Sequence, residues 1–503
     1  MRVSSYIIGA QLPDERFYIL MHGLNGSLDK VSAATGSYLL EHRGAEVTRP
    51  PWLPLDATGK HLEARGYTTD LSAEQERELM VNVATAIHQS DLASSQPSFV
   101  FVPAYTCNLR CPYCFQSHDM HAGRGIYASM MDEARVDDAF RVIDAFTEPG
   151  SLARELSMLA VDDPAPGHQR SPLRRVGLFG GEPLTRATRP VVAYIVEQAR
   201  RRGAALWAIT NGVELDAFTD LMGRDGITDL QITLDGMPDV HDRRRIGPGI
   251  RRSFDRIADN IDLALSASSR VSARINVDSS NVDQVELLDE FFALRGWSGH
   301  SSFSAHAAVV TGESTHESLV SHAQLLSITN RAGGGCVRSY EGYADGVLGR
   351  ALSEEYPFQR VAHCSAETGM LMFDPHGDVY ACWEEIGIKD RRVGDYHNGV
   401  LRLDDDNAPA WLSRFPGAVE QCSRCPYALI HTSGCANHAR ANHDTIFAAA
   451  CEDFQSYFPG SLADRYTAIE AAALGSAINR PPHVHRLPIV EVTGGRTATM
   501  TRE

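Results

Sequence analysis

Three cysteines on one short segment could do the most distinctive chemistry in this chain. Cys107, Cys111 and Cys114 have C-x3-C-x2-C spacing and follow an apolar run at residues 99–103. Three thiolates on one loop can hold three irons of a cubane [4Fe-4S] cluster, whereas a closed cluster takes four ligands. The alternative is a zinc site, but zinc normally takes four ligands in a closed tetrahedron, commonly from C-x2-C pairs. The spacing therefore favours a cluster whose fourth iron is open to a substrate or cofactor.

Two glycines and a glutamate directly follow the next apolar run, at residues 176–179. Gly180 and Gly181 let the backbone approach a ligand closely because they have no Cβ. Glu182 offers a carboxylate for a charge-assisted hydrogen bond to an ammonium group. Taken alone, Gly-Gly-Glu could be an ordinary turn, but its place at a strand end after the three cysteines favours a ligand site.

These two motifs together resemble those of the radical S-adenosylmethionine (SAM) enzymes. The resemblance implies that the open iron chelates the amino and carboxylate groups of SAM, and that residues 180–182 hold its amino group. It also implies that Tyr113, between the second and third cysteines, lies beside the adenine. In similar enzymes a hydroxyl or carboxylate from the fourth strand reaches SAM, so Thr233 and Asp235 are expected cofactor contacts.

Polar residues at the ends of the expected strands also have a second interpretation. Asn and Asp at strand ends commonly form turns and cap helices, and this is the alternative for Asn211, Asp235, His241 and Asp242. Arg244 and Arg245 follow directly and could form a solvated basic cluster near the rim.

Seven further cysteines lie between residues 336 and 451. The six that follow Cys336 have the order C-x12-G-x4-C, then C-x2-C, then two single cysteines. This order is similar to the SPASM extension, which carries two auxiliary [4Fe-4S] clusters in enzymes that modify peptides and proteins. The resemblance implies a first auxiliary cluster on Cys364, Cys382 and Cys435, and a second on Cys422, Cys425 and Cys451. The alternative for the whole block is a structural zinc domain.

Each auxiliary cluster lacks a fourth cysteine. The usual SPASM block C-x2-C-x5-C-x3-C has His431 in place of its third cysteine here. Imidazole replaces thiolate in Rieske centres and raises their reduction potential, so His431 is a candidate fourth ligand of the second cluster. Otherwise His431 is a plain loop residue, and that cluster has three protein ligands or is absent. Cys336 could complete the first cluster, or remain a free thiol beside an open iron.

The elements around these residues predict an α/β fold. Strands and helices alternate as in β/α units. The strands are expected at residues 99–103, 176–179, 206–210, 230–234, 271–277 and 303–310. The helices are expected at 130–146, 190–202, 253–266 and 282–294, with an exposed, mobile insertion at 150–174. This pattern predicts a partial (β/α)6 barrel with its reactive loops at the carboxyl ends of the strands.

Four segments are expected along the chain. Residues 1–95 have strands at 6–10 and 17–21 and helices at 28–42 and 73–89, and they resemble a winged-helix leader-peptide-binding module. A plain N-terminal cap on the barrel is the alternative. Residues 96–329 are the barrel, and residues 330–457 are the loop-rich SPASM region, whose folding should depend on metal. Residues 458–503 carry a helix at 462–477 and a tail.

Composition restricts the partners and the compartment. The 503 residues carry a net charge of −17, which argues against a nucleic-acid surface because such surfaces need Lys and Arg. No apolar run is long enough to span a membrane, and Asp14 and Glu15 come too early for a signal peptide. We therefore expect a cytoplasmic protein whose ten cysteines are metal ligands or reactive thiols rather than disulfides.

The resemblance implies three [4Fe-4S] clusters and SAM as cofactors, and a flavodoxin- or ferredoxin-like external electron donor. Reductive cleavage of SAM would give a 5'-deoxyadenosyl radical that abstracts hydrogen from a precursor peptide carrying a leader. The expected product is an oxidative crosslink, either a thioether or a carbon–carbon bond. The difficult chemistry belongs to the cofactors, and the protein orients the reactants and excludes water.

Two other functions are weighed against this one. A formylglycine-forming sulfatase maturase would carry Asp directly after the second auxiliary cysteine, where this chain has Trp383. Asp378, Glu384 and Glu385 are conceivable bases, although a solvated acidic loop is the simpler interpretation. An iron-sulfur electron-transfer or scaffold protein is the alternative from another class, but it would not need the Gly-Gly-Glu segment.

Overall fold

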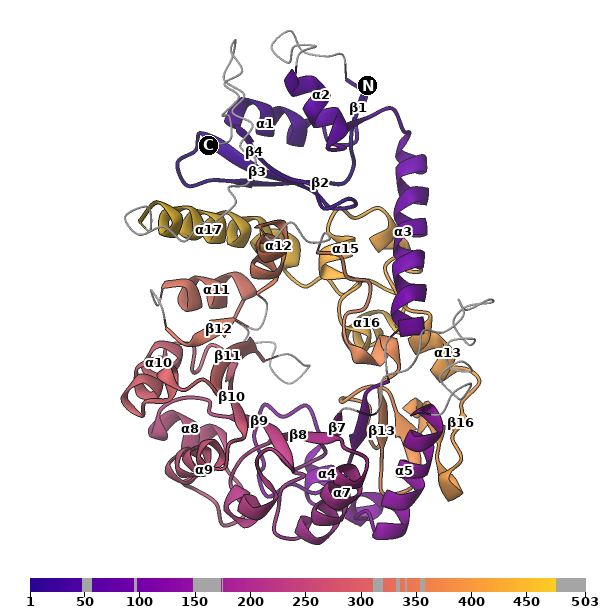
Figure 1. The fold of residues 1–503 in the computed structure, drawn as a ribbon, viewed down its shortest axis with the longest axis vertical. Coiled ribbons are helices and arrows are strands. Elements are labelled where there is room, and N and C mark those ends of the chain that lie inside the picture. The colour runs from indigo at the N-terminus through magenta and orange to yellow at the C-terminus, as the bar shows by residue number, and fades with distance from the viewer. Residues whose placement is uncertain are drawn as a thin grey trace. The chain divides into compact units, whose positions relative to one another are not determined.

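The computed structural model describes residues 1–47, 57–94, 97–147, 173, 175–310, 320–331, 335–339, 342–352 and 358–475 (Figure 1). Contacts divide the chain into two compact units that interleave in sequence. The first unit comprises residues 1–88, 342–363 and 414–503, and the second comprises 89–341 and 364–413. The expected segment 330–457 is thus shared between both units. The expected mobile insertion, apart from Leu173, and the tail beyond residue 475 lie outside the described residues.

The second unit contains the expected barrel sheet. Its strands are β6 (Phe99–Phe101), β7 (Arg175–Leu178), β8 (Ala205–Thr210), β9 (Ile227–Thr233), β10 (Arg270–Val277) and β11 (Phe303–Val309). Each pairs in parallel with its neighbour, so all six predicted strands are present. The helices between them are α5 (Glu133–Thr147), α7 (Arg189–Arg201), α8 (Pro238–Arg244), α9 (Phe254–Ser266) and α10 (Gln284–Leu294). The α/β fold class is therefore confirmed.

The sheet extends beyond the predicted strands at both ends. On one side β12 (Val337–Ser339) pairs in parallel with β11 and is followed in the chain by α12 (Tyr343–Leu352) of the first unit. On the other side β13 (Leu371–Phe373) pairs in parallel with β6. An antiparallel run continues from β13 through β14 (Asp378–Tyr380), β15 (Gly394–Asp395) and β16 (Arg402–Leu403). Strands from the SPASM-like part of the sequence thus complete the barrel sheet.

The two faces of the barrel sheet differ in polarity. Along β10, buried Val271, Ala273, Ile275 and Val277 alternate with more exposed residues, as expected for a strand with one face against helices. Figure 1 shows α7, α8, α9 and α10 on the outer side of the curved sheet, and α9 contacts β10. The face opposite the helices is therefore the one that carries the polar side chains.

The N-terminal part of the first unit is an antiparallel sheet followed by helices. Strands β2 (Ile7–Gln11), β3 (Phe17–His22) and β4 (Leu28–Ser32) form a meander. Helices α1 (Ala33–Glu41), α2 (Ala57–Ala64) and α3 (Ala73–Ser94) follow, and two short strands, β1 (Arg2–Val3) and β5 (Thr68–Thr69), pair with each other. The predicted helix start at residue 28 is wrong, because β4 occupies residues 28–32 and the Ser32 hydroxyl caps α1 by accepting from the Thr35 N–H at 3.3 Å.

The C-terminal part of the first unit is made of short helices and one long one. These are α14 (Glu420–Ser423), α15 (Ala428–His431), α16 (Ala436–His443) and α17 (Phe454–Gly475). Helix α17 begins eight residues before the predicted position, although it contains Pro459. The earlier start buries aromatic side chains, since the Phe454 and Phe458 rings stack at 5.0 Å.

One hydrophobic core joins the two parts of the first unit. Tyr6 and Leu24 of the N-terminal part pack in one buried cluster with Met80 of α3, Cys422 and Leu429. The Tyr6 hydroxyl also donates to the Ser423 carbonyl at 2.6 Å. The N-terminal module therefore packs against the segment that carries a predicted ligand of the second auxiliary cluster.

Candidate active site and auxiliary cysteines

The three closely spaced cysteines lie on the loop that follows β6, which we call the cysteine loop (residues 102–117). Its turns are closed by the Cys114 N–H, which donates to the Cys111 carbonyl at 3.1 Å, and by the Cys107 N–H, which donates to the His121 carbonyl at 3.1 Å. Burial raises the pKa of all three thiols, that of Cys114 to about 11. Because iron binds the thiolate, these ligands need the positive charge of the metal to ionise.

Polar groups surround the sulfur atoms of this loop. The Leu109 N–H donates to Cys107 Sγ at 3.3 Å, and Asn211 Nδ2 lies 3.9 Å from the same atom. His121 Nε2 lies 3.7 Å from Cys114 Sγ, and burial lowers the pKa of His121 to about 4, so the ring is neutral. Hydrogen bonds to sulfur are among the factors that set the potential of an iron-sulfur cluster. His121 lies on the short helix α4 (His118–His121), and no local sequence pattern indicates its proximity to Cys114.

The two glycines of the Gly-Gly-Glu segment are required by the cysteine loop itself. A Cβ on Gly181 would lie 2.1 Å from the Tyr105 carbonyl oxygen, and a Cβ on Gly180 would lie 2.4 Å from the Ala104 carbonyl oxygen. Gly180 also has φ +147°, which L side chains rarely adopt. The absence of Cβ atoms therefore lets the end of β7 pack directly on the backbone before Cys107.

The Glu182 carboxylate joins the ends of β7 and β8. One oxygen accepts from the Leu184 N–H at 2.9 Å and from the Thr210 hydroxyl at 2.6 Å, and the other accepts from the Asn211 N–H at 2.6 Å. The residue is 1% exposed, and burial raises its pKa while these hydrogen bonds oppose that shift. A carboxylate has about four lone-pair sites, so one remains for the predicted ammonium contact.

Tyr113 belongs to a buried charged network. Its hydroxyl donates to the fully buried carboxylate of Asp235 and accepts from Arg245 Nη1 at 2.7 Å. The Arg244 guanidinium lies 4.7 Å from the centroid of the Tyr113 ring. The expectation of a solvated cluster at Arg244 and Arg245 is wrong, because both are buried around Tyr113 and Asp235. A network of this kind fixes the cysteine loop against the ends of β9 and β10.

The other strand-end residues divide between structural roles and the site. Asp242 accepts from the Ser253 N–H at 2.8 Å and caps α9, so the capping interpretation holds for it. His241 Nδ1 accepts from the Asp235 N–H at 3.2 Å. Asn211 closes a turn by accepting from the Val213 N–H at 2.9 Å, yet its amide also faces the cysteine loop. Thr233 is the buried last residue of β9.

Residues 101–291 match the Radical SAM superfamily, and this segment holds the cysteine loop, the Gly-Gly-Glu segment and the Tyr113 network. This part of the chain is therefore a Radical SAM domain. Such a domain implies a [4Fe-4S] cluster and SAM. The buried or half-buried thiols, the donors around them and the acceptor site left on Glu182 fit that pair. Among the described residues, no helix is long and apolar enough to cross a membrane.

Several known proteins are similar to this chain. GTP 3',8-cyclase of Synechocystis sp. is 27% identical over 131 residues, which is 26% of this chain and 31% of the cyclase. The solved structure of anSMEcpe with bound AdoMet has a TM-score of 0.51 at 14% identity, covering 76% of this chain and 100% of that one. Streptococcus suis SuiB bound to precursor peptide SuiA has a TM-score of 0.48 at 12% identity, covering 89% and 98%. The anSMEcpe structure shows a shared fold, and the curated cyclase is matched over less than a third of its length.

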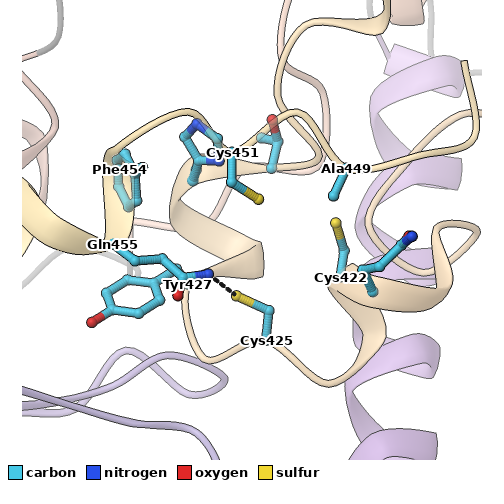
Figure 2. Close-up of a pocket in the computed structure, with 10 residues that line it drawn as sticks. Cys422, Cys425, Tyr427, Ala449, Cys451, Phe454 and Gln455 are labelled. Carbon is cyan, nitrogen blue, oxygen red and sulfur yellow. Dashed lines mark hydrogen bonds between the residues drawn. The ribbon is translucent and has the colours of Figure 1, made fainter. Parts of the chain in front are cut away.

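One pocket of the first unit is lined by the residues predicted for the second auxiliary cluster (Figure 2). Cys422 lies on α14, Cys425 in the turn that follows, His431 at the end of α15 and Cys451 just before α17. The pocket contains about 380 Å³ of empty space, part of it open to solvent. No three His, Cys, Asp or Glu side chains in the described part of the chain are placed to hold a single metal ion. The four side chains instead surround a space, which suits a group several atoms wide.

Neighbouring groups fix the side chains of this pocket. The His431 ring lies 4.3 Å from the ring of Phe454, centroid to centroid. Gln455 Nε2 donates to Cys425 Sγ at 3.7 Å, as the dashed line in Figure 2 shows. Burial raises the pKa of Cys422 to about 12 and that of Cys425 to about 11. As in the cysteine loop, these thiols need a bound cation to ionise. The assignment of the four residues as ligands remains a prediction.

The residues predicted for the first auxiliary cluster lie in both units. Cys364 precedes β13 and Cys382 follows β14, so the antiparallel hairpin brings these two positions to the same end. Cys435 belongs to the other unit. Cys336 lies just before β12, where its Sγ accepts from the Ser298 hydroxyl at 3.4 Å, and six strands separate β12 from β13 in the sheet. The place of Cys336 in the first cluster remains a prediction.

The acidic residues after β13 are not a solvated loop. Asp378 is 2% exposed and forms ion pairs with Lys389 and Arg392, and Glu385 is 1% exposed. The residue after Cys382, Trp383, packs its ring against Phe179 at 4.8 Å, centroid to centroid. An aromatic contact therefore occupies the position where a sulfatase maturase would carry Asp.

Proposed function

We propose that this radical SAM enzyme is a peptide maturase that forms an oxidative crosslink in a ribosomally made precursor peptide. The observation that carries the proposal is the set of buried or half-buried thiols on the cysteine loop, which packs against the Gly-Gly-Glu segment and the Tyr113 network. Cys107, Cys111 and Cys114 would hold a cluster that would supply the electron for reductive cleavage of SAM to methionine and a 5'-deoxyadenosyl radical. The radical would take one hydrogen atom from a substrate carbon. Formation of the thioether or carbon–carbon bond would then release a proton to solvent and one electron, which an auxiliary cluster would accept.

In this proposal the residues of the chain orient SAM and exclude water. Gly180 and Gly181 bring the strand end against the loop, and Glu182 accepts a hydrogen bond from the amino group of SAM. Tyr113 lies beside the adenine, held by Asp235 and Arg245, and Thr233 provides a hydroxyl at the end of β9. Such preorganised groups do not have to be reoriented during the reaction.

Two observations support a peptide substrate. The structure of anSMEcpe with bound AdoMet and Kp18Cys peptide has a TM-score of 0.50 with this chain at 14% identity. The N-terminal module, a three-stranded meander with three helices, has the elements of a winged helix. Edge strands of such sheets can pair with an extended peptide, so we assign this module to leader binding.

The second auxiliary cluster is proposed to have three cysteine ligands and His431. His431→Cys should restore the usual ligand set and lower the reduction potential of that cluster, because imidazole ligation raises it. His431→Ala should reduce the iron content and change the electron paramagnetic resonance signal. Unchanged iron content and spectra in both variants would exclude ligation by His431. A first auxiliary cluster on Cys364, Cys382 and Cys435, and electron supply from a flavodoxin- or ferredoxin-like donor in the cytoplasm, complete the proposal.

Two assays separate this function from its alternatives. The anaerobically reconstituted enzyme should release 5'-deoxyadenosine from SAM with a strong reductant, and an electron-transfer or scaffold protein would not. Co-expression with a short peptide encoded beside this gene should give a product that has lost two hydrogens. Formation of an aldehyde on a sulfatase peptide would instead identify a formylglycine maturase, a function that the aromatic contact of Trp383 disfavours.

A further inference from the structure

One row of side chains crosses four strands on the polar face of the barrel sheet. The strand register pairs Thr233 with Arg274, Arg274 with His306, and His306 with Arg338. Paired positions in a parallel sheet share a face, and neighbouring strands lie about 4.8 Å apart. These four residues therefore form a continuous row, which we call the Arg274 row, leading from a predicted SAM contact to the edge strand β12.

The Arg274 row lies on the face opposite the helices. Arg274 is partly exposed, whereas Ala273 and Ile275 on either side of it are buried. His306 is also partly exposed, and Arg338 is exposed. The row therefore borders the side of the sheet where a substrate must approach the cysteine loop, because the other side is covered by helices.

Hydrogen bonds connect the row to the predicted SAM site. Arg274 Nε donates to Asn276 Oδ1 at 2.8 Å. Asn276 Nδ2 in turn lies 3.3 Å from Asp235 Oδ1 and 3.5 Å from the Tyr113 hydroxyl. Arg274 is thus separated from the Tyr113 network by a single side chain. A group bound by Arg274 would lie close to the position where the radical forms.

The charge of the row is positive in a strongly acidic protein. Burial, together with the Arg274 charge, lowers the pKa of His306 to about 4, so His306 is neutral at pH 7 and lies 3.1 Å from the Ser272 hydroxyl through Nδ1. Arg274 and Arg338 supply two guanidinium groups on this row, in a chain with a net charge of −17. Planar guanidinium groups match carboxylates in geometry as well as in charge.

We infer that the Arg274 row binds a carboxylate of the peptide substrate, from an Asp or Glu side chain close to the residue that is modified. The inference rests on the proposed peptide maturase function and adds to it a substrate class. The carboxylate accepts hydrogen bonds from the guanidinium groups, which orients the peptide across β10 to β12 and presents the neighbouring residue to the radical.

The test compares two probe peptides that differ only in charge. Acetyl-Gly-Ser-Glu-Ser-Gly amide and its Gln counterpart are titrated calorimetrically into the reconstituted, SAM-loaded enzyme. The Glu peptide should bind about tenfold more tightly than the Gln peptide, and Arg274→Gln should abolish this preference. Arg338→Gln, at an exposed position that should not affect folding, should reduce the preference at least threefold.

Arg270→Gln is the matched control. Arg270 lies on the same strand and face as Arg274, about 13 Å away at four residues of strand rise, and pairs with Asp229 at 2.6 Å. This variant should keep the full preference for the Glu peptide.

Equal binding of both peptides by the wild type, or equal losses of preference in the Arg270 and Arg274 variants, would overturn the inference. So would an Arg274→Gln variant that kept the peptide preference but had a raised KM for SAM, because the row would then serve the cofactor. Release of 5'-deoxyadenosine by the wild type, measured in parallel, tests the proposed function separately.

Discussion

Replacing Gly181 by alanine should loosen the contact between β7 and the cysteine loop. The new Cβ would lie 2.1 Å from the Tyr105 carbonyl oxygen and 2.5 Å from the Thr106 carbonyl oxygen. Both are backbone atoms, so no side chain can rotate away, and the two segments must separate by about 1 Å. Overpacking of this kind costs about 1–3 kcal/mol. The hydrogen bond from the Glu182 N–H to the Thr106 carbonyl, 2.9 Å long, would also weaken, which costs about 1 kcal/mol more.

The free energy of unfolding of Gly181→Ala should therefore fall by about 2–4 kcal/mol. It can be measured by urea unfolding under anaerobic conditions, followed by tryptophan fluorescence. Because the displaced carbonyls directly precede Cys107, the iron bound to the cysteine loop should decrease as well. Gly299→Ala is the matched control, since nothing lies within 4 Å of its Cβ position. A Gly181→Ala protein with the same stability and iron content as Gly299→Ala would refute the reasoning.

Three further predictions follow from the buried polar groups. Burial lowers the pKa of His22 from 6.5 to about 4, so the unfolded chain binds more protons and stability should fall as the pH drops from 6.5 towards 4. His22→Gln should flatten this dependence in pH-dependent urea unfolding. His121→Ala should make the potential of the cysteine-loop cluster more negative in a redox titration, whereas the exposed His118→Ala should not. Asp235→Ala should cost about 3–5 kcal/mol of unfolding free energy, because it leaves Arg245 buried without its carboxylate. A loss below about 1 kcal/mol would show that the pair contributes little.

The barrel could be predicted from sequence because its signals are local. Each strand of the barrel is an apolar run next to a polar strand end, and each helix shows its own periodicity. Strand β4 was missed because Leu-Asp-Lys-Val-Ser is too short to distinguish a strand from the first turn of a helix. The pairing of β13 with β6 was also missed, since it joins residues far apart in the chain and leaves no local pattern.

The residues of the candidate site likewise divide into those with a local sequence signal and those positioned by tertiary contacts. Cysteine spacing and the Gly-Gly-Glu segment are local, so both were found directly from the residues. The contact of Tyr113 with Asp235 spans 122 residues and that with Arg245 spans 132. Without these partners, adjacent arginines in a sequence suggest a solvated surface, because Arg is rarely buried unless it is paired. Burial of Arg244 and Arg245 therefore depends on tertiary contacts that no single segment encodes.

The parallel pairing of β13 with β6 limits how this enzyme can be dissected. Strand β6 leads directly into the cysteine loop, and its other neighbour is β7. A fragment ending at residue 330 would expose one side of β6 as an open edge, with unpaired backbone groups that favour aggregation. A fragment that carries the cysteine loop should therefore stay soluble and folded more readily when it includes residues 364–413, which supply β13.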